Sequence, residues 1–368
     1  MSRVLVVNTG SSTLKLALVE VEPDGPALRR DLLVDPWDGD DGALAVAIAE
    51  LGPVDVVGHR VVHGGADLVE ATVVDDTVFD RVRSLASLAP LHQPRAVAGL
   101  VAARRHLPDV PHVACFDTAF HAGMAASART YALPPEWRER WGLQRFGFHG
   151  LSHAWASRRG PEVAGLAPGA ARRTIVCHLG SGASLCAVLD GRSVDTTMGF
   201  TPLEGLVMRT RCGSVDPGLV LWLLTGAGLA AEEVDDGLVH RSGLAGLSGT
   251  DGDMRRVLAA RDAGDAAAAL AFDVFVHRLR QGVAAMAASV GGLDLLVFTA
   301  GIGEHSPAVR AAAADGLTFL GVALDPAAND AARGDADLTA AGTAVRTVVV
   351  AAREDLEIAR QVHAAVGG

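Results

Sequence analysis

Short runs of Val, Ile and Leu alternate along this chain with Ala-rich segments whose apolar residues recur every three or four positions. The first pattern is typical of buried β-strands and the second of amphipathic helices. Strands are expected at 3–7, 14–20, 54–58, 111–115, 174–178, 184–189, 293–299 and 346–351. Helices are expected at 41–51, 93–106, 152–159, 216–225, 264–290, 306–316 and 354–366. This alternation predicts an α/β protein with mixed sheets.

Two distant segments share one pattern, VLVVNTGSSTLKLALVE at 4–20 and TIVCHLGSGASLCAVLDG at 174–191. Each reads as a strand, a turn of small residues with Gly and Ser, and a second strand. Such a β-hairpin exposes backbone N–H groups in its turn, where they can bind phosphate. One interpretation is a duplicated domain with one phosphate-binding turn in each copy. The other is that two Gly/Ser hairpins arose by chance.

Composition and charge narrow the class of protein. A length of 368 residues suggests two domains, and a net charge of −11 argues against a nucleic-acid partner, which needs a basic face. The four Cys residues have neither C-x-x-C nor zinc spacing, which fits a reducing cytoplasm. No signal peptide precedes the first strand, and no apolar run reaches the ~18–20 residues of a membrane span. We therefore expect a soluble, cytoplasmic protein without a membrane or nucleic-acid partner.

The only Lys of the chain, Lys15, stands in the first hairpin, although the chain has 31 Arg. The segment NTGSSTLK lacks the spacing of a Walker loop. It nevertheless offers a tight turn at Gly10, hydroxyl groups at 11–13 and the amide oxygen of Asn8. A Lys ammonium is a compact charge on a flexible stem, suited to a moving phosphate oxygen. We prefer this interpretation to a solvated hairpin in which one Lys survived.

Three further motifs place chemically active side chains beside predicted strands or helices: GHRVVHGG at 58–65, VACFDTAFH at 113–121 and RFGFHGLSH at 145–153. Taken alone, Arg60 fits a surface ion pair, and Asp117 fits a helix N-cap as well as a functional carboxylate. His149 and His153 are four residues apart, but no third ligand supports zinc.

Two loop segments also have features that are typical of functional sites. The segment 196–218 is long, rich in Gly and Pro, and carries Arg209 and Arg211; loops of this length inside compact domains are usually functional. The segment FTAGIGEHS at 298–306 follows a buried strand and opens a helix, where a nucleotide base and ribose are expected.

Taken together, these motifs resemble the acetate kinase family, within the actin/Hsp70/sugar-kinase superfamily. The resemblance runs in order from residue 3 to about 360, and also includes LAPLHQP, DTTMGFTPLEGLVMRTR and REDLEIAR. It implies two duplicated actin-like (ribonuclease H-like) domains, with mixed sheets flanked by helices and the active site in the interdomain cleft. The domains are expected at 1–119 and 120–355, with a last helix, about 356–368, folding back onto the first. A homodimer through the second domain is also implied.

The resemblance implies reversible phosphoryl transfer from ATP to acetate, giving acetyl phosphate and ADP, with Mg²⁺ (or Mn²⁺). The implied catalytic residues are Arg60, Asp117, His149 and Arg211, and the implied metal-binding residues are Asn8 and Glu354. The residues implied to hold the nucleotide are Ser11, Thr13, Lys15, His178, Leu179, Gly180, Ser181, Gly182, Asp253, Met254, Arg255, Gly301, Ile302, Gly303, Glu304 and His305. Those implied to contact acetate are Arg60, Val62, Leu91, His92, Phe148 and Pro202.

Ser181, His305 and Arg353 stand where the family has Asn, which leaves the donor open. The alternatives are a propionate or butyrate kinase, a pyrophosphate-dependent relative, or a non-catalytic ATP-binding module of the same fold. Acetate is already ionised at neutral pH, so the reaction needs cations that bring two anions together rather than a strong base. We therefore interpret Asp117 as an orienting group, not a proton abstractor.

Overall fold

A computed structural model describes residues 2–10, 13–37, 39–89 and 93–367. The chain divides into two compact units. Unit 1 comprises Met1–Ala122, Phe148–Trp155 and Arg353–Gly368, and unit 2 comprises Gly123–Gly147 and Ala156–Ala352. Within the described ranges, no helix has the length and apolar character needed to cross a membrane.

Unit 1 is built on a six-stranded mixed sheet with the strand order β3-β2-β1-β4-β6-β5. Its strands are β1 (Ser2–Thr9), β2 (Leu14–Glu22), β3 (Gly25–Val34), β4 (Val56–Val61), β5 (Thr72–Val73) and β6 (His112–Phe116). The first three form an antiparallel meander, β4 and β6 run parallel to β1, and β5 pairs antiparallel with β6 at the far edge.

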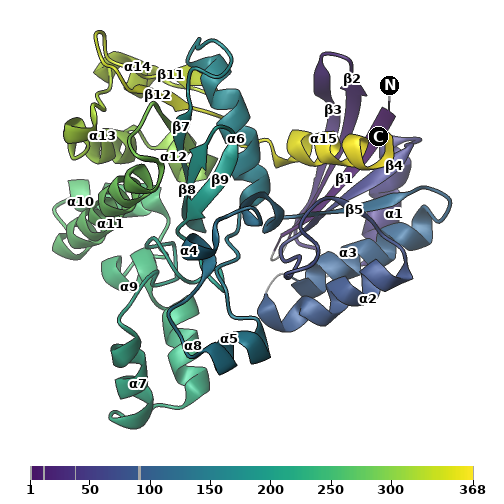
Figure 1. Cartoon of the computed structure of the whole chain (residues 1–368), viewed down its shortest axis with the longest axis horizontal. Helices are drawn as coiled ribbons and strands as arrows, with labels where there is room; N and C mark the ends of the chain where they lie inside the picture. The colour runs from purple at the N-terminus through teal and green to yellow at the C-terminus, as the bar shows by residue number, and fades with distance from the viewer. Residues whose placement is uncertain (1, 11–12, 38, 90–92, 368) are drawn as a thin grey trace. The chain divides into compact units, whose positions relative to one another are not determined.

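Helices cover both faces of this sheet because successive residues of β1 point to opposite sides. Val4 and Val6 pack against Ile358 and Val362 of the C-terminal helix α15 (Glu354–Gly367). The alternate positions of β1 join a second apolar cluster with α1 (Asp41–Leu51) and α3 (Gln93–His106). Figure 1 shows α15 lying along this sheet, far in sequence from the strands it covers. The unit is completed by α2 (Asp76–Ser84) and the 3-10 turns η1 (Leu85–Leu88) and η2 (Ala119–His121).

Unit 2 has a second six-stranded sheet, with the order β11-β12-β10-β7-β8-β9. Its strands are β7 (Arg173–Leu179), β8 (Ala183–Leu189), β9 (Arg192–Thr196), β10 (Leu295–Thr299), β11 (Ala336–Asp337) and β12 (Arg346–Val349). Here too the first three strands form an antiparallel meander. The next two run parallel to the first, and a short antiparallel strand closes the edge.

The two sheets therefore repeat one topology, strand for strand, which confirms the duplicated architecture. The repeat extends to detail: the second strand of each meander has an irregular register, between Leu18 and Val19 in β2 and between Ala187 and Val188 in β8. The last paired residues before the connection are Thr9 and Leu14 in the first hairpin and Leu179 and Ala183 in the second, so the second hairpin has the shorter connection. The chance interpretation of the two hairpins is therefore wrong.

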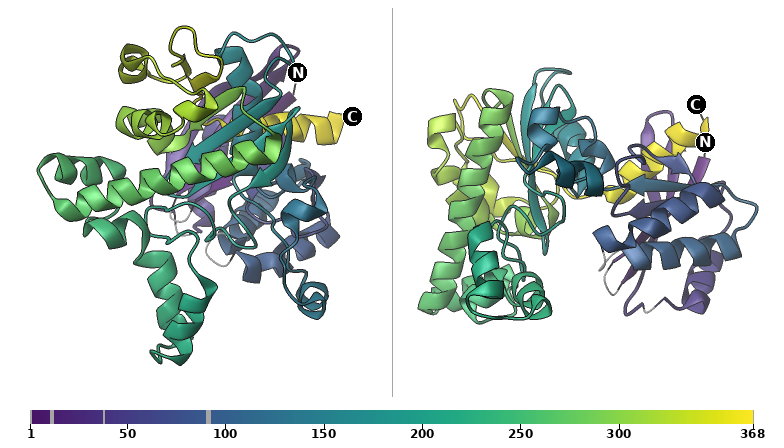
Figure 2. Two further views of the ribbon diagram at one scale, coloured as in Figure 1. Left: turned by 60° about the vertical axis from the view of Figure 1, so that its left-hand side comes forward. Right: turned by 60° about the horizontal axis from the view of Figure 1, so that its bottom comes forward.

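The remaining helices belong mainly to unit 2. The longest, α11 (Ala266–Val290), contacts β7, β8 and β9 and is the long green helix in the left view of Figure 2. The others are α4 (Ala126–Arg129), α5 (Pro135–Trp141), α6 (Gly150–Val163), α7 (Pro217–Thr225), α8 (Ala231–His240), α9 (Gly243–Ser248), α10 (Met254–Asp262), α12 (Ala300–His305), α13 (Pro307–Asp315), η3 (Thr318–Leu320) and α14 (Pro326–Ala331). Residues 148–155, expected in the second domain, cluster with unit 1.

Candidate functional site

The carboxyl ends of three neighbouring parallel strands carry the polar residues of unit 1. Asn8 lies near the end of β1, Arg60 near the end of β4, and Asp117 directly follows β6. The backbone N–H of Asp117 donates to the carbonyl of Val61 over 3.0 Å, so the chain leaves both strands in register. Because parallel strands end at one edge of a sheet, their terminal side chains meet there.

Arg60 is the centre of this polar cluster. Its Nε and Nη2 donate to the two carboxylate oxygens of Asp117, over 3.1 and 2.7 Å. Its Nη1 donates to Asn8 Oδ1 over 3.3 Å and lies 3.4 Å from Glu354 Oε2, at the start of α15. The Asp117 side chain is only 2% exposed. Neither a surface ion pair nor a helix cap describes this arrangement. Arg60 is a largely buried guanidinium fixed by a bidentate carboxylate.

The burial of this ion pair affects both partners. Burial lowers the pKa of Arg60, but the carboxylates of Asp117 and Glu354 outweigh burial and raise it overall. Burial raises the pKa of the Asp117 carboxyl, and the guanidinium of Arg60 opposes that rise. Both carboxylate oxygens of Asp117 already accept hydrogen bonds, which is the geometry of a group that orients Arg60.

The same cluster has oxygen atoms of the kind that Mg²⁺ prefers. Asn8 Oδ1 and the Glu354 carboxylate lie next to each other, with Asn8 Nδ2 donating to Glu354 Oε2 over 3.4 Å. In the described part of the chain, no group of three or more His, Cys, Asp or Glu side chains is placed to hold a metal. Asn8 and Glu354 could supply at most two oxygen ligands to such an ion, whose other ligands would be water or phosphate.

The His149 loop is tied to Asp117 through the backbone. The N–H of Gly150 donates to the carbonyl of Asp117 over 2.8 Å, and a Cβ at Gly150 would overlap that carbonyl. His149 itself has a φ of 57°, a left-handed conformation that costs energy for a residue other than Gly and recurs at functional sites. Phe148 and Val62, both expected near the acetate methyl group, are buried in unit 1.

Lys15 pairs directly with Asn8 across the β1–β2 ladder. It is exposed, and no carboxylate in the described ranges comes within ion-pair distance of its ammonium. The turn beside it closes with a 2.7 Å hydrogen bond from the N–H of Gly10 to the carbonyl of Thr13. Of the other predicted site residues, Ser11, Leu91 and His92 lie outside the described residues.

Unit 2 contains a cavity of about 490 Å³ that brings together three segments predicted to hold a nucleotide. The predicted residues that line it are Gly180, Ser181, Asp253, Met254, Arg255, Gly301, Ile302 and His305. The predicted residues on the same segments that do not line it are His178, Leu179, Gly182, Gly303 and Glu304. The turn after β7 and the segment after β10 meet because Thr299 pairs with His178 in parallel strands.

Arg209 is a lining residue to which the sequence assigned no role. Its Nε and Nη2 donate to the backbone carbonyl and the carboxylate of Asp251, over 2.9 and 2.8 Å. Its backbone N–H donates to the carbonyl of Ser181 over 3.1 Å. Asp253 caps α10, and hydrogen bonds from Arg255 hold its pKa well below the usual range. The signal for Arg209 in the sequence was its position in the long Gly- and Pro-rich segment 196–218, two residues before Arg211.

Arg211 and Pro202 lie on the long connection between β9 and α7, as expected. Arg211 Nη1 donates to the carbonyl of Pro202 over 2.5 Å. Burial lowers the pKa of Arg211, and within the described residues no carboxylate pairs with its guanidinium. A half-buried cation without a carboxylate partner is suited to binding an anionic ligand. Arg60 belongs to unit 1 and Arg211 to unit 2, and the predicted cleft between the domains stays a prediction.

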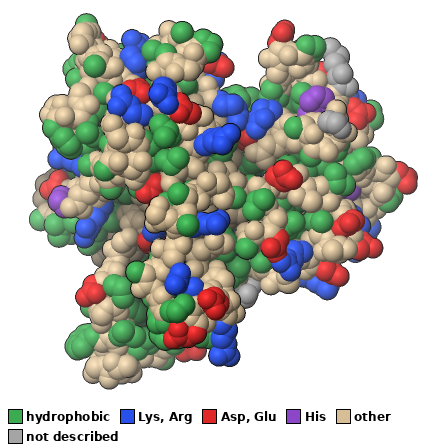
Figure 3. Space-filling model, in the orientation of Figure 1, with side chains coloured by type: hydrophobic (Ala, Val, Ile, Leu, Met, Phe, Trp, Pro, Cys, Tyr) green, Lys and Arg blue, Asp and Glu red, His purple; other side chains and the backbone are tan. Residues whose placement is uncertain are grey.

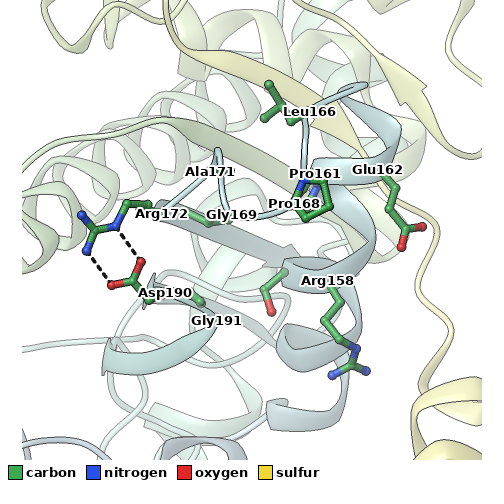
Figure 4. Close-up of a pocket in the computed structure, with 13 residues that line it drawn as sticks. Arg158, Pro161, Glu162, Leu166, Pro168, Gly169, Ala171, Arg172, Asp190 and Gly191 are labelled. Carbon is green, nitrogen blue, oxygen red and sulfur yellow. Dashed lines mark hydrogen bonds and ion pairs between the residues drawn. The ribbon is translucent and has the colours of Figure 1, made fainter.

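Another cavity of unit 2, about 440 Å³, lies between α6 and the β7–β9 meander. Figure 4 shows its lining, including the surface ion pair of Arg172 with Asp190, and Arg158 and Glu162 on α6. None of the predicted site residues lines it. Arg172 pairs with Asp190 and Glu162 with Arg159 on the surface, and we assign this cavity no function.

Comparisons with known proteins cover both units. A model of the Acetokinase family matches residues 40–360. An acetate kinase of Leifsonia xyli subsp. xyli is 45% identical, over 100% of this chain and 99% of its own. One from Trichormus variabilis is 47% identical, over 85% of this chain and 77% of its own.

Solved structures extend the similarity to the whole fold. An acetate kinase of Porphyromonas gingivalis superposes with a TM-score of 0.88 at 32% identity, covering 100% of both chains. A propionate kinase of Francisella tularensis subsp. tularensis gives the same TM-score at 31% identity, again over 100% of both chains.

Proposed function

Because this chain belongs to the acetokinase family, we propose that it transfers a phosphoryl group reversibly between ATP and acetate, giving acetyl phosphate and ADP. The observation that carries this proposal is the cluster at the carboxyl ends of β1, β4 and β6. There a largely buried Arg60 is held by Asp117, and its remaining N–H groups face Asn8 and Glu354. A module that only bound ATP would not need this second polar centre in unit 1.

The chemistry requires positive charge more than it requires a base. Acetate is ionised at neutral pH, and the obstacle is the repulsion between its carboxylate and the phosphoryl donor. Arg60 and Arg211 are the guanidinium groups proposed to hold the carboxylate and the transferred phosphoryl group. Asp117 fixes the plane of Arg60, and His149 donates a hydrogen bond to the phosphoryl oxygens.

Asn8 and Glu354 are proposed to hold Mg²⁺ (or Mn²⁺), with Lys15 on the neighbouring strand contacting donor phosphate. The ion would supply positive charge that offsets the negative charge of the phosphates. Glu354 also pairs with Arg60, so the two positive groups would share one carboxylate. Removing the metal with a chelator is expected to abolish turnover, and adding Mg²⁺ is expected to restore it.

The cavity of unit 2 is proposed as the donor site. Its volume of about 490 Å³ lies within the ~300–1,000 Å³ typical of small-molecule sites. Its walls include the apolar side chains of Met254, Leu258, Ile302 and Pro307. Apolar walls suit a nucleoside, whose base can be buried against them, whereas pyrophosphate has no apolar part that could pack there. This lining favours ATP over the pyrophosphate alternative.

Propionate is the second candidate acceptor, since one structural relative is a propionate kinase. Val62, Phe148 and Pro202 are proposed to surround the methyl group, and the space between them would set the acid length. One extra methylene in an apolar site is worth only ~1–3 kcal/mol. The kcat/KM for acetate is therefore expected to exceed that for propionate by about 10–200-fold.

A homodimer is proposed through unit 2, where α7 has no buried side chain. Leu219, Leu221 and Trp222 of this helix are 45%, 62% and 59% exposed. Green hydrophobic side chains gather over α7 at the lower left of Figure 3. An apolar helix exposed in this way is expected to bury its surface against a second copy. A cytoplasmic location is proposed as well.

The direct test is the hydroxamate assay, in which hydroxylamine traps the acyl phosphate. Purified protein would be given acetate, propionate or butyrate with ATP, GTP or pyrophosphate, in the presence of Mg²⁺. We expect acetyl hydroxamate with ATP, less product with propionate and none with pyrophosphate. Binding of ATP without acyl phosphate from any acid would support the non-catalytic module instead.

A further inference from the structure

We propose that Tyr131, the only tyrosine of the chain, is a positioning residue that fixes the loop carrying Pro202 and Arg211. This inference rests on the proposed function, because it concerns where the acetate-binding groups of unit 2 are held. Tyr131 would thus support the site from outside, without being one of the residues proposed to contact the substrates.

The loop needs such support because regular structure does not hold it. It runs from the end of β9 at Thr196 to the start of α7 at Pro217, with no helix or strand in between. A connection of this length has no regular ladder of backbone hydrogen bonds. Its path is fixed by scattered backbone bonds, such as those from the N–H groups of Phe146 and Gly147 to the carbonyl of Gly199, and by side chains.

The anchor of the loop is a small scaffold at 129–146. Thr130 and Gln144 form an antiparallel bridge, and the N–H of Arg145 donates to the carbonyl of Arg129 over 2.8 Å. This bridge sets Tyr131 and Arg145 side by side, with the Arg145 guanidinium carbon 5.6 Å from the centre of the Tyr131 ring. Both side chains then reach the loop.

The Tyr131 hydroxyl makes two hydrogen bonds to the loop. It donates to Glu204 Oε2 over 2.6 Å and accepts from the backbone N–H of Phe200 over 2.9 Å. Arg145 holds the other oxygen of Glu204 over 2.7 Å and donates to the carbonyl of Met198 over 3.0 Å. A Cβ on Gly199 would overlap both the Glu204 carboxylate and the Tyr131 hydroxyl, so the backbone passes directly against this network.

These contacts hold the loop on both sides of Pro202. Phe200 lies two residues before Pro202 and Glu204 two residues after it, and one hydroxyl bonds to both. The carbonyl of Pro202, between them, accepts the 2.5 Å hydrogen bond from Arg211. The direction of the Arg211 guanidinium therefore depends on a turn whose two ends are joined by Tyr131. The proposed acyl contact of Pro202 depends on the same turn.

The perturbation that tests this is Tyr131→Phe, which removes only the hydroxyl. We expect kcat with acetate to fall by about 10–100-fold, because a misplacement of ~1 Å can cost that much. The KM for acetate should rise and the ratio of propionate to acetate turnover should change, while the KM for ATP stays within about twofold. A structural role alone would not separate the two substrates in this way.

The matched control is Ser193→Ala, which removes a buried hydroxyl of β9 that interacts with the Cys186 thiol. It is expected to leave both KM values and kcat near those of the wild type. Glu204→Gln keeps the size of the side chain and should reproduce the acetate defect of Tyr131→Phe. The double variant should be no worse than about the more affected single variant, because the two residues act as one unit.

A single tyrosine also allows a test that does not depend on activity. Burial, followed by the hydrogen bond to Glu204, raises the pKa of Tyr131 to about 12. The near-ultraviolet absorbance of tyrosinate should therefore be nearly absent in the folded protein at pH 10, where a free tyrosine is half ionised. Half-ionisation near pH 10 in the folded wild type would overturn the network.

Wild-type kinetics with acetate in the Tyr131→Phe variant would overturn the positioning role even if the titration is as expected. Failure of the proposed function has a different signature, because the wild type itself would then form no acyl phosphate.

Discussion

Replacing Asp117 by Asn tests the polar cluster of unit 1 at its least exposed member. The change keeps the shape of the side chain but removes the charge and turns one acceptor into a donor that faces Arg60. Asp117 is 2% exposed and Arg60 19% exposed, so water cannot replace the lost carboxylate. Removing one partner of a buried ion pair typically costs ~3–5 kcal/mol. Glu354 remains 3.4 Å from Arg60, so we expect the lower end, about 3 kcal/mol.

Two measurements check this value. Urea unfolding at neutral pH gives the loss of unfolding free energy, and the hydroxamate assay gives turnover. We expect kcat to fall by about 10²–10³ at saturating substrates, since Arg60 loses its fixed orientation while the fold remains.

The matched control for Asp117 is Asp190→Asn. Asp190 accepts the same bidentate pair of hydrogen bonds, 2.7 and 2.8 Å, from Arg172, as Figure 4 shows. These side chains are 50% and 66% exposed, so this variant should change stability little and turnover not at all. Equal losses of stability in the two variants, or wild-type turnover in Asp117→Asn, would show that the buried Asp117–Arg60 pair does not have the proposed role.

Three further predictions concern separate parts of the molecule. Arg211→Ala should lower kcat by about 10²–10³ with the fold intact, and unchanged turnover in the purified variant would remove Arg211 from the site. Burial lowers the pKa of His121 to about 4, below the ~6.5 of the unfolded chain, so the unfolded state binds the extra proton first. The contribution of His121 to the free energy of unfolding should therefore be fully present above pH 6.5 and fall by about 1.4 kcal/mol per pH unit between pH 6.5 and pH 4. The variant His121→Asn should show a shallower loss of stability over this range in thermal melts. Trp222→Glu on α7 should produce monomers in light scattering while Val46→Glu, also an exposed apolar position, should not; a Trp222→Glu protein that keeps the wild-type mass would exclude α7 from the interface.

The expected strands and helices are all present, with ends shifted by a few residues, because each contains a run or cluster of apolar residues. Several of the elements that were missed are short or rich in charged residues. The edge strand β3, GPALRRDLLV, has no buried residue and carries charged side chains, so its own residues do not indicate a strand. Helix α8, AEEVDDGLVH, buries a single side chain, Val234, and its polar sequence reads as a loop.

Some residues of the candidate site could also be recognised from the sequence, and others could not. Lys15 and Asn8 stood out from the sequence because their residue types are rare in this chain, and the hairpin places them in one register. Arg60 and Asp117 were each ambiguous, since a bidentate bond between two strands cannot be seen in either segment alone. Tyr131 is just as rare, but it lies in none of the motifs, and its partners Phe200 and Glu204 lie about 70 residues further along the chain in a loop.

The sequence by itself determined the two hairpins, the alternation of strands and helices, and the motifs that resemble one family. These are local properties, written in the period of apolar residues and in the turn residues between them. Only the tertiary structure decided that three parallel strands end with Asn8, Arg60 and Asp117 side by side, and that one tyrosine holds a loop. Those contacts join residues far apart in the chain, and their strength comes from burial, which no single segment can provide.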